Sequence, residues 1–578
     1  MSSAVPMRSM LSACFPWISR LISLAAVVVL VGLMPDIAGI DPSQSILRAR
    51  SGQQQLLTPE ALASIREDLR LDRSATERLI DWLSHALRGD LGVSWVDGSP
   101  VFDSVKATAK TSLLLVSSTL AFVIVGCLNS IGYAVIQWRR GRFEQQHSTL
   151  SSVLVSLPEY VIAALLILVF SIGLGWFPPY GWQGLQNLWL PSIALALPAT
   201  GLFTRLLYDS LKRVFKEPWV ITWLSANISQ WQIVRFALWR AMSNLIPQIA
   251  MIVIGLMGGA VAVELIFSIP GIGRLILGAA KSQDLPLLQG GLLVLLVISM
   301  AISSLSLLLQ RKLLGHSATN GKLISSHSAF KFTQSNVKRV AAGVIFVLLA
   351  SCALIASLRD PFAIQFMRLE PASLAAPFGS DAIGRDLLAR VGGGMISTMK
   401  MGVLAMLVSL TLGLAFGFLT RYSQGLIEIT KGIPYIVAGL LVAGLMGMHP
   451  NSALIAIVLV SWAPLASHCA SLLVEAKAQP YTHLAPTWGT SRWRILRYYL
   501  LPYVLPPLVR HALLRLPVIT LSLTSLSFIG LGAKAPSPEW GLLIAENLPY
   551  IERAPQAVLL PISGLVLLAV AINLLFDD

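Results

Sequence analysis

The sequence predicts an all-α integral membrane protein whose roughly twelve transmembrane helices form two parallel six-helix halves. Of its 578 residues, 55% are apolar and only 12% are charged, whereas a soluble protein carries about a quarter charged residues. The mean hydropathy is +0.72. Apolar residues gather in stretches of roughly 20, the length that crosses a bilayer core of about 30 Å. A polar segment separates these stretches into two sets, which predicts the two halves.

The apolar stretches define the predicted helices. They lie at 16–34, 112–136, 153–175, 187–208, 246–267, 288–310, 339–357, 397–420, 432–449, 452–474, 512–531 and 556–576. The first half then covers 1–309, a Ser-, Lys- and Asn-rich linker 310–338, and the second half 339–578. Each half repeats one plan, with a long external loop after its first helix and a basic loop between its fourth and fifth. The external loops are predicted at about 35–110 and 358–395, and the basic loops at about 209–245 and 475–510. Because each half has an even number of helices, the halves run parallel.

The distribution of basic residues predicts orientation. Short loops rich in Lys and Arg alternate with the uncharged segment from Phe177 to Asn187, and such basic loops stay in the cytoplasm. Both termini are therefore predicted inside. The formal net charge of +15 follows from this bias and requires no nucleic-acid partner. One of these basic loops contains Arg139, Arg140 and Arg142, another contains Lys212, Arg213 and Lys216, and the linker segment is the third.

Catalytic chemistry is not predicted in this chain. Gly315 to Leu323 (GHSATNGKL) resembles a phosphate-binding loop, but five residues separate its glycines instead of four, and Leu323 replaces the magnesium-binding Ser or Thr. We interpret it as linker. The sequence contains no metal-ligand cluster or nucleophile triad, and its four cysteines are too few for a disulfide framework. We therefore expect a protein that is not an enzyme and holds no cofactor or metal.

One loop in the second half carries a recognisable element. From its residues alone, APFGSDAIGRDLLARVGGG predicts that Asp381 caps a helix opening near Ala382, with Arg385 and Asp386 exposed on its first turns. The loop closely resembles the Gly-Thr-Asp-x-x-Gly-Arg-Asp element of the dipeptide, oligopeptide and nickel permease family of bacterial ABC importers. Ser380 stands in place of the Thr, and Gly384 keeps its position.

Other segments support this resemblance. LSFIGLGAKAPSPEWG, with Glu539 and Trp540, resembles the loop before the last helix of that family's second permease subunit. Similarity to the first subunit begins near Leu71. It continues through the segment from Val263 to Gly290, which contains Glu264, Gly271 and Arg274. The resemblance therefore implies a fusion of two permease subunits that are separate chains elsewhere in the family.

The resemblance implies a pore in the bacterial cytoplasmic membrane that works by alternating access. Two cytoplasmic ATPase subunits would use ATP and Mg²⁺, and an extracytoplasmic binding protein would deliver the cargo. That cargo stays open between a dipeptide, a longer peptide, nickel and a metal-chelator complex. The alternative is a twelve-helix secondary transporter coupled to an ion gradient, a class that usually relies on midplane carboxylates.

Permeases of this class contact their ATPases through a short helix marked by Glu-Ala-Ala, three residues and Gly. In the second half, His483, Leu484 and Ala485 occupy the first positions and Gly489 the turn. In the first half, Asn227 falls on the turn, which requires a left-handed backbone that Asn tolerates. The first-half surface is Trp219, Thr222, Trp223, Leu224 and Ser225. ATPase docking is the preferred interpretation of this surface, and an interfacial anchor made by its two tryptophans is the alternative.

Ionisable residues within predicted helices are candidates for the substrate path. They are Glu159, Glu264, Lys400 and His468. We favour Glu159, which follows Pro158. Its carboxylate either faces the pore, where it would attract an amino group or a cation, or pairs with a neighbouring helix, and both possibilities stay open.

Overall fold

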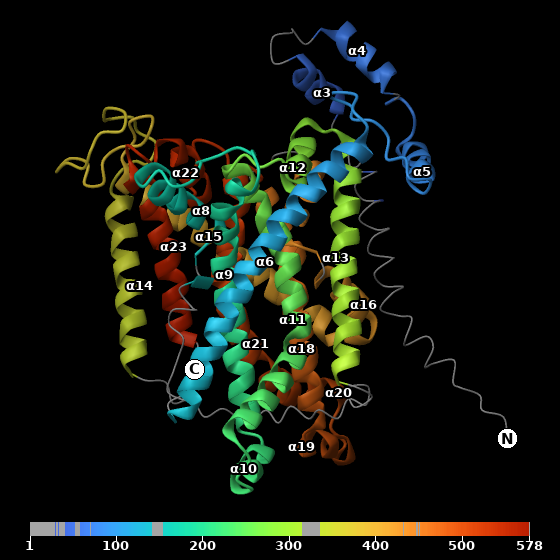
Figure 1. Ribbon diagram of the computed structural model, residues 1–578, viewed down its shortest axis with the longest axis vertical. Coiled ribbons are helices and arrows are strands. Elements are labelled where there is room, and N and C mark those ends of the chain that lie inside the picture. The colour runs from blue at the N-terminus through green and yellow to red at the C-terminus, as the bar shows by residue number, and fades with distance from the viewer. Residues whose placement is uncertain are drawn as a thin grey trace, which may run out of the picture. The chain divides into compact units, whose positions relative to one another are not determined.

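The computed structural model describes residues 29, 33, 41–51, 58–69, 71–141, 154–155, 157–314, 336–431, 433–446, 449 and 451–576. Nearly all of the predicted first helix, 16–34, lies outside the described residues. So do the segment Gly315 to Leu323 and most of the predicted linker. The described residues form helices and connecting loops, with isolated bridges in place of strands (Figure 1).

Most helices follow the predicted apolar stretches. In chain order the described α-helices are α3 (Pro42–Ser51), α4 (Pro59–Asp68), α5 (Ala75–Ala86), α6 (Val101–Arg139), α8 (Glu159–Leu166), α9 (Trp189–Phe215), α10 (Pro218–Ser225), α11 (Gln230–Ile266), α12 (Ile272–Ser282), α13 (Leu285–Leu314), α14 (Asn336–Ser357), α15 (Leu387–Phe418), α16 (Thr420–Lys431), α17 (Tyr435–Met446), α18 (Ser452–Ala478), α19 (Pro480–Leu484), α20 (Arg492–Ile495), α21 (Leu501–Ile529), α22 (Trp540–Asn547) and α23 (Pro555–Phe576). Short 3₁₀ or π segments are η2 (Ile167–Gly173), η3 (Leu185–Leu188), η5 (Ala485–Trp488), η6 (Leu496–Leu500) and η7 (Leu548–Tyr550).

Within the described part of the chain, nine helices are long and apolar enough to cross a membrane. Two further predicted spans are shorter than a bilayer requires. Glu159–Gly173 replaces the predicted 153–175, and α17, with 12 residues, replaces 432–449. Each begins directly after a proline, Pro158 or Pro434, which favours extended backbone in the residue before it. The all-α membrane class is confirmed, whereas the count of twelve is not.

The long helices α6, α11, α15 and α21 begin well before their predicted bounds. α6 begins at Val101, before the predicted 112, because its first turns carry Asp103, Lys106 and Lys110 among the apolar residues. The last long helix before α22 is continuous from Arg492 to Ile529, although prediction began it at 512. Hydropathy underestimates such helices because charged side chains interrupt the apolar stretch without ending the backbone hydrogen bonding.

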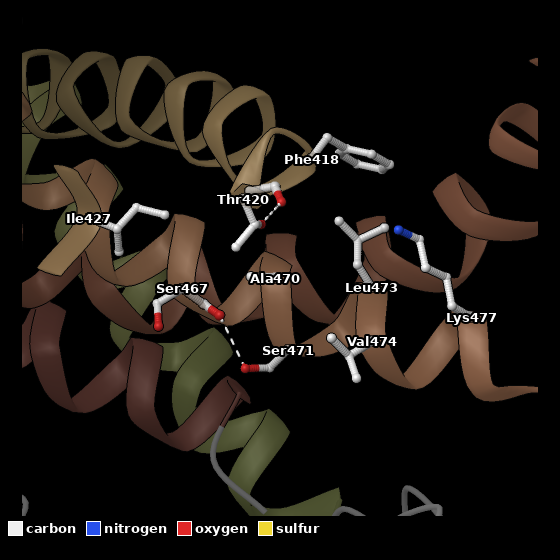
Figure 2. A pocket seen from close by; sticks show the side chains of 10 residues that line it. Phe418, Thr420, Ile427, Ser467, Ala470, Ser471, Leu473, Val474 and Lys477 are labelled. Atoms are coloured by element: carbon white, nitrogen blue, oxygen red, sulfur yellow. Dashed lines mark hydrogen bonds between the residues drawn. The ribbon is translucent and has the colours of Figure 1, made fainter. Parts of the chain in front are cut away.

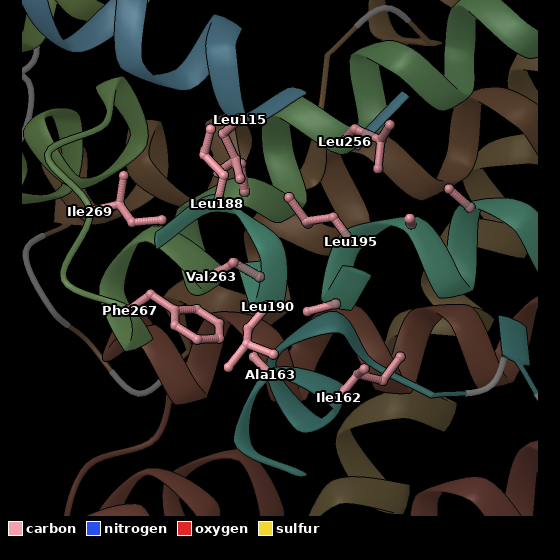
Figure 3. Packing of buried hydrophobic residues seen from close by; sticks show 14 of the residues in the cluster. Leu115, Ile162, Ala163, Leu188, Leu190, Leu195, Leu256, Val263, Phe267 and Ile269 are labelled. Atoms are coloured by element: carbon pink, nitrogen blue, oxygen red, sulfur yellow. The ribbon is translucent and has the colours of Figure 1, made fainter. Parts of the chain in front are cut away.

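The chain forms two compact units. The first contains the described residues within Met1–Lys106, Leu275–Leu296 and Ala342–Asp577, and the second those within Ala107–Arg274 and Val297–Ala341. In the second unit, α9 packs against α8 and α11. Their apolar side chains, including Leu195, Val263 and Phe267, form a core with Leu115 of α6 (Figure 3).

Helix α15 is central to the first unit, where it packs against α18, α21, α22 and α23. Small residues permit the closest approach. A Cβ added at Gly413 would lie 2.6 Å from Cβ of Leu465, and one at Gly417 would lie 2.5 Å from Cβ of Cys469. Membrane helices associate through such close backbone contacts because lipid offers no hydrophobic driving force between them.

Candidate functional site

In the first-half sequence, the short helix α12 is held at its start by a buried carboxylate and a hydroxyl. Glu264, near the end of α11, is 0% exposed. The Ser112 hydroxyl of α6 donates to Oε1 of Glu264 at 2.6 Å and accepts the backbone N–H of Ile272 at 2.8 Å. Oε2 of Glu264 accepts the backbone N–H of Arg274 at 3.0 Å. Free N–H groups at a helix start are thereby satisfied out of contact with water.

Gly271 makes this arrangement possible because it leaves room for the glutamate. A Cβ added there would lie 2.1 Å from Cδ of Glu264. The side chain of Arg274 is exposed, so its backbone rather than its charge takes part. The three residues singled out here by sequence therefore meet at one helix start, together with Ser112, which sequence reasoning missed. No sequence signal links Ser112 to Glu264, 152 residues further along the chain.

The second-half sequence builds the same arrangement at α22. Glu539, 2% exposed, caps this helix, and its Oε2 accepts the backbone N–H of Leu542 at 3.0 Å. The Thr398 hydroxyl of α15 donates to Oε1 of Glu539 at 3.4 Å and accepts the N–H of Trp540 at 3.2 Å. Burial raises the pKa of the Glu539 carboxyl, and hydrogen bonds from two backbone N–H groups and two hydroxyls act in the opposite direction.

The two caps match group for group but not position for position. In each, the first residue of the short helix donates to a hydroxyl on the long helix that follows the external loop of its half, α6 or α15. The carboxylate accepts the N–H two residues later. Glu264, however, stands eight residues before Ile272, whereas Glu539 immediately precedes Trp540. The two halves thus share the same pattern of hydrogen bonds at these caps, although the spacing of the residues in their sequences differs.

The loop between α14 and α15 forms a buried ion network instead of the predicted surface helix. Asp381 accepts the backbone N–H groups of Ile383 and Arg385, each at 2.9 Å, but this closes a turn. The helix begins later, at Leu387, where Asp386 is the N-cap and accepts the N–H of Leu388 at 2.9 Å. The prediction that Asp381 caps a helix was therefore wrong.

Arg385 and Asp386 are each 5% exposed, so the prediction that they project from the surface was also wrong. Arg385 pairs with Asp381 at 2.7 Å and with Glu546 of α22 at 3.1 Å. Arg390, fully buried, joins the same two carboxylates at 3.4 and 3.0 Å. These opposite charges satisfy one another, because an unpaired buried charge would be strongly destabilising.

Backbone contacts fix this loop further. Gly384 has φ 96°, and a Cβ added there would lie 2.3 Å from the carbonyl oxygen of Phe366, so only glycine fits. Arg359 pairs with Asp386 at 2.6 Å, and Arg390 donates to the carbonyl oxygen of Pro536 at 3.2 Å. The network therefore ties the start of α15 to the segment before α22.

In the first-half basic loop, α10 is held against α11 by aromatic rings. Trp219, Trp223 and Phe236 have mutual centroid distances of 5.1, 5.0 and 5.2 Å. Glu217 accepts from the Trp219 indole at 2.9 Å and pairs with Arg240 at 2.9 Å. The two tryptophans thus pack on the protein. Thr222, Ser225 and Asn227 are exposed, as are Ile221 at 67% and Leu224 at 45%.

In the second-half basic loop, α19 and η5 form a compact turn. Gly489 has φ 73° and Asn227 has φ 55°, so the positive φ predicted at both turn positions is present. Ala485 is buried, whereas Leu484 is 48% and Trp488 70% exposed. His483 lies in α19, and its side chain is outside the described residues. Both loops therefore present apolar side chains to their surroundings.

Of the ionisable residues within predicted helices, Glu159 is half-buried at the start of α8. A Cβ added at Gly259 of α11 would lie 3.0 Å from its Oε1, so the carboxylate packs directly on that helix. Lys400 is exposed on α15. His468 of α18 packs against His511 of α21, with ring centroids 4.5 Å apart and the ring planes tilted by 34°. Prediction missed Arg510 and His511 because it began that helix at 512, and it overlooked Arg515, which lies within the predicted 512–531.

A pocket of about 440 Å³ lies between α15, α16 and α18 (Figure 2). Its lining mixes apolar and hydroxyl side chains with a single charged one, Lys477, so it offers no acid–base pair for a reaction. Among the residues that the structure describes, no group of three His, Cys, Asp or Glu side chains is placed to hold a metal ion.

A helical chain with many membrane-crossing segments and the same capped short helix built twice is a membrane protein with an internal repeat. The family model for the binding-protein-dependent transport system inner membrane component matches residues 113–315 and again 395–577, and the chain belongs to this family. It is a pore-forming permease of an ABC importer and a multi-pass inner-membrane protein that is not itself an enzyme. Such permeases work with ATPase and substrate-binding partners, and the secondary-transporter alternative is not favoured.

Curated relatives match about half of the chain. The glutathione transport system permease protein GsiC of Salmonella choleraesuis is 27% identical over 273 residues, which cover 47% of this chain and 87% of that protein. GsiC of Escherichia coli O6:H1 is 29% identical over 274 residues, with the same coverage. A putative peptide transport system permease of Brucella suis biovar 1 is 30% identical over 291 residues, 48% of this chain and 90% of that protein. The double family match and these half-length alignments identify a fused pair of permeases.

Proposed function

We propose that this chain supplies both halves of the pore through which an ABC importer moves peptides, or peptide-like solutes such as glutathione, into the cytoplasm. The observation that carries the proposal is the double family match, one on each side of the predicted linker. The relatives named for glutathione and peptide transport support this cargo class over nickel. On this proposal one polypeptide does what two subunits do elsewhere, with halves at 1–309 and 339–578.

The segments α10 and α19–η5 are the proposed contacts for two cytoplasmic ATPases. Each presents exposed apolar side chains beside a left-handed turn residue, Asn227 or Gly489. Apolar patches rimmed by polar residues mark protein interaction sites. The aromatic packing of Trp219 and Trp223 supports docking over membrane anchoring, because their rings contact Phe236.

This assignment also orients the chain. With α10 and α19 in the cytoplasm, both termini are inside and the caps at α12 and α22 face outward, toward an extracytoplasmic binding protein. ATP and Mg²⁺ then act only in the partner subunits, while this chain uses no cofactor. Membrane lipid is the remaining partner, and no nucleic acid is required. Glu159 keeps a proposed role beside the substrate path.

The test is reconstitution. The full chain and its ATPases are reconstituted in proteoliposomes, with ATP enclosed in the lumen and the binding protein outside. These vesicles should accumulate a labelled dipeptide, a longer peptide or glutathione. ADP serves as the control. Accumulation driven by a proton or sodium gradient without ATP would contradict the importer assignment. ATP-driven uptake of Ni²⁺ with none of any peptide would contradict the cargo class.

A further inference from the structure

Helices α18 and α21 lie side by side and run antiparallel. Tyr503 donates to Oε1 of Glu475 at 2.8 Å, and further along both helices His468 packs against His511. As the residue number rises on α21 it falls on α18, which fixes the register. One turn beyond His511, on the same face of α21, stands Arg515. The register places it level with Pro464, inside α18.

Arg515 lies inside the helix that is continuous from Arg492 to Ile529, twenty-three residues from its first residue and fourteen from its last. At a rise of about 1.5 Å per residue, these are about 35 Å and 21 Å from the two ends. Its Nε is fully enclosed and has no hydrogen-bond partner within the described residues. A guanidinium is always ionised, and an ionisable group within a membrane-spanning helix marks a functional site.

No acid on either helix neutralises this charge. Glu475 is the single acidic residue of α18 and already accepts from Tyr503, which lies twelve residues, about 18 Å, from Arg515 along α21. Helix α21 contains no acid. The groups beside Arg515 are instead the two packed imidazole rings. The site therefore combines a fixed positive charge with two imidazoles, and it would repel a cation.

We propose that Arg515, with His511 and His468 beside it, forms a carboxylate-binding site on the substrate path of this permease. A guanidinium binds a carboxylate through two parallel N–H···O bonds, a geometry that a lysine ammonium does not reproduce. Every peptide with a free C-terminus presents such a carboxylate. The site deepens the proposed function and rests on it, because it names the substrate group that the pore recognises.

Direct binding tests the site without requiring transport. The full chain in lipid nanodiscs is titrated with N-acetyl-Ala-Ala and with the same compound amidated at its C-terminus, and thermal stabilisation gives apparent dissociation constants. We expect the free acid to stabilise the protein and Arg515→Gln to weaken its binding about tenfold or more, since charge-assisted hydrogen bonds are lost. The amide should bind wild type as weakly as the acid binds Arg515→Gln.

Two further variants distinguish a loss of carboxylate recognition from a general effect of removing a charge or of impaired folding. Arg510→Gln removes the same charge from the same helix but about 140° around it, and binding should stay within about twofold. Arg515→Lys keeps the charge without the planar fork, and binding should fall between wild type and Arg515→Gln. Membrane abundance and unliganded stability of each variant report folding. A third ligand, N-acetyl-Ala-Glu amide, shows whether a side-chain carboxylate can replace the terminal one.

Equal binding of acid and amide to wild type, or unchanged acid binding in a folded Arg515→Gln protein, would overturn the site and leave the proposed function intact. Conversely, carboxylate binding that depends on Arg515, found together with no ATP-driven uptake of any peptide, would support the site and refute the proposed cargo. The two failures are therefore distinguishable.

Discussion

Trp540 packs in space that two glycines leave open. A Cβ added at Gly394 of α15 would lie 2.2 Å from the carbonyl oxygen of Pro538 and 2.7 Å from Cδ1 of Trp540. One added at Gly564 of α23 would lie 2.5 Å from Cη2 of the indole. The indole N–H donates to the carbonyl oxygen of Val391 at 2.8 Å. The two glycines thus leave the space in which the Trp540 indole packs, and this packing fixes the capped start of α22.

Gly394→Ala should destabilise the protein by about 1–3 kcal/mol, because the new methyl meets backbone that cannot move aside. Its neighbour is a matched control. A Cβ at Gly393 would meet nothing closer than 3.5 Å, so Gly393→Ala should be neutral or slightly stabilising through helix propensity. Thermal unfolding in detergent and membrane abundance measure both. Equal stability of the two variants would show that the segment before α22 shifts freely.

At the scale of single residues, the sequence identified the important residues well but predicted their contacts poorly. Glu264, Asp381 and Arg385 were singled out, yet Asp381 closes a turn instead of capping a helix. The pairing of Arg390 with Glu546 spans 156 residues. Such contacts depend on which helices pack together, and local patterns in a chain carry no information on that.

The two basic loops reach similar turns through unequal support. Helix α10 is fixed by three aromatic rings and by the pair between Glu217 and Arg240, independently of the turn at Asn227. Helix α19 has only five residues, and beyond the contact of Tyr481 with Tyr499 and the hydrogen bond from Thr482 to Ala476 its direction depends on η5 and on the left-handed turn at Gly489. A change at the turn should therefore matter more in the second half.

Gly489→Val places a β-branched residue at φ 73°, a strain of at least about 1 kcal/mol that should tilt α19–η5. We expect it to abolish substrate-stimulated ATP hydrolysis at normal membrane abundance. Asn227→Val, at φ 55°, carries a similar penalty but should leave a measurable fraction. Asn227→Gly is the control and should retain activity, since glycine adopts this conformation freely. Equal loss in both valine variants would mean that the halves couple symmetrically.

Hydropathy located most elements and failed in a consistent way. It missed the N-terminal turns of α21, where Arg510 and His511 break the apolar pattern. Arg515 lies within the predicted 512–531 and was overlooked there. It overestimated the lengths of α17 and of the helix from Glu159 to Gly173, because hydropathy does not distinguish apolar residues next to a proline from apolar residues in a helix. Composition predicts that a segment is apolar, whereas helix ends depend on capping and on tertiary contacts.

At the scale of the whole molecule, each predicted half closes its own cap. Ser112, Glu264 and Ile272 all precede the linker, while Thr398, Glu539 and Trp540 all follow it. Residues of both halves nevertheless share one compact unit, since Leu275–Leu296 clusters with Ala342–Asp577. Contacts between residues of the two halves therefore join them in addition to the covalent connection.

This arrangement predicts that the linker is a dispensable tether. Covalent linkage mainly raises the effective concentration of the halves, to the millimolar range for a short flexible connection, and adds no contact of its own. Coexpressed fragments 1–320 and 321–578 should copurify and restore ATP-driven uptake to a large fraction of the intact chain, whereas either fragment alone should give none. If the fragments insert, copurify and remain stable yet fail to transport, residues near the break must transmit motion between the halves. If they insert but do not copurify, the packed helices are too weak to assemble the pore without the tether.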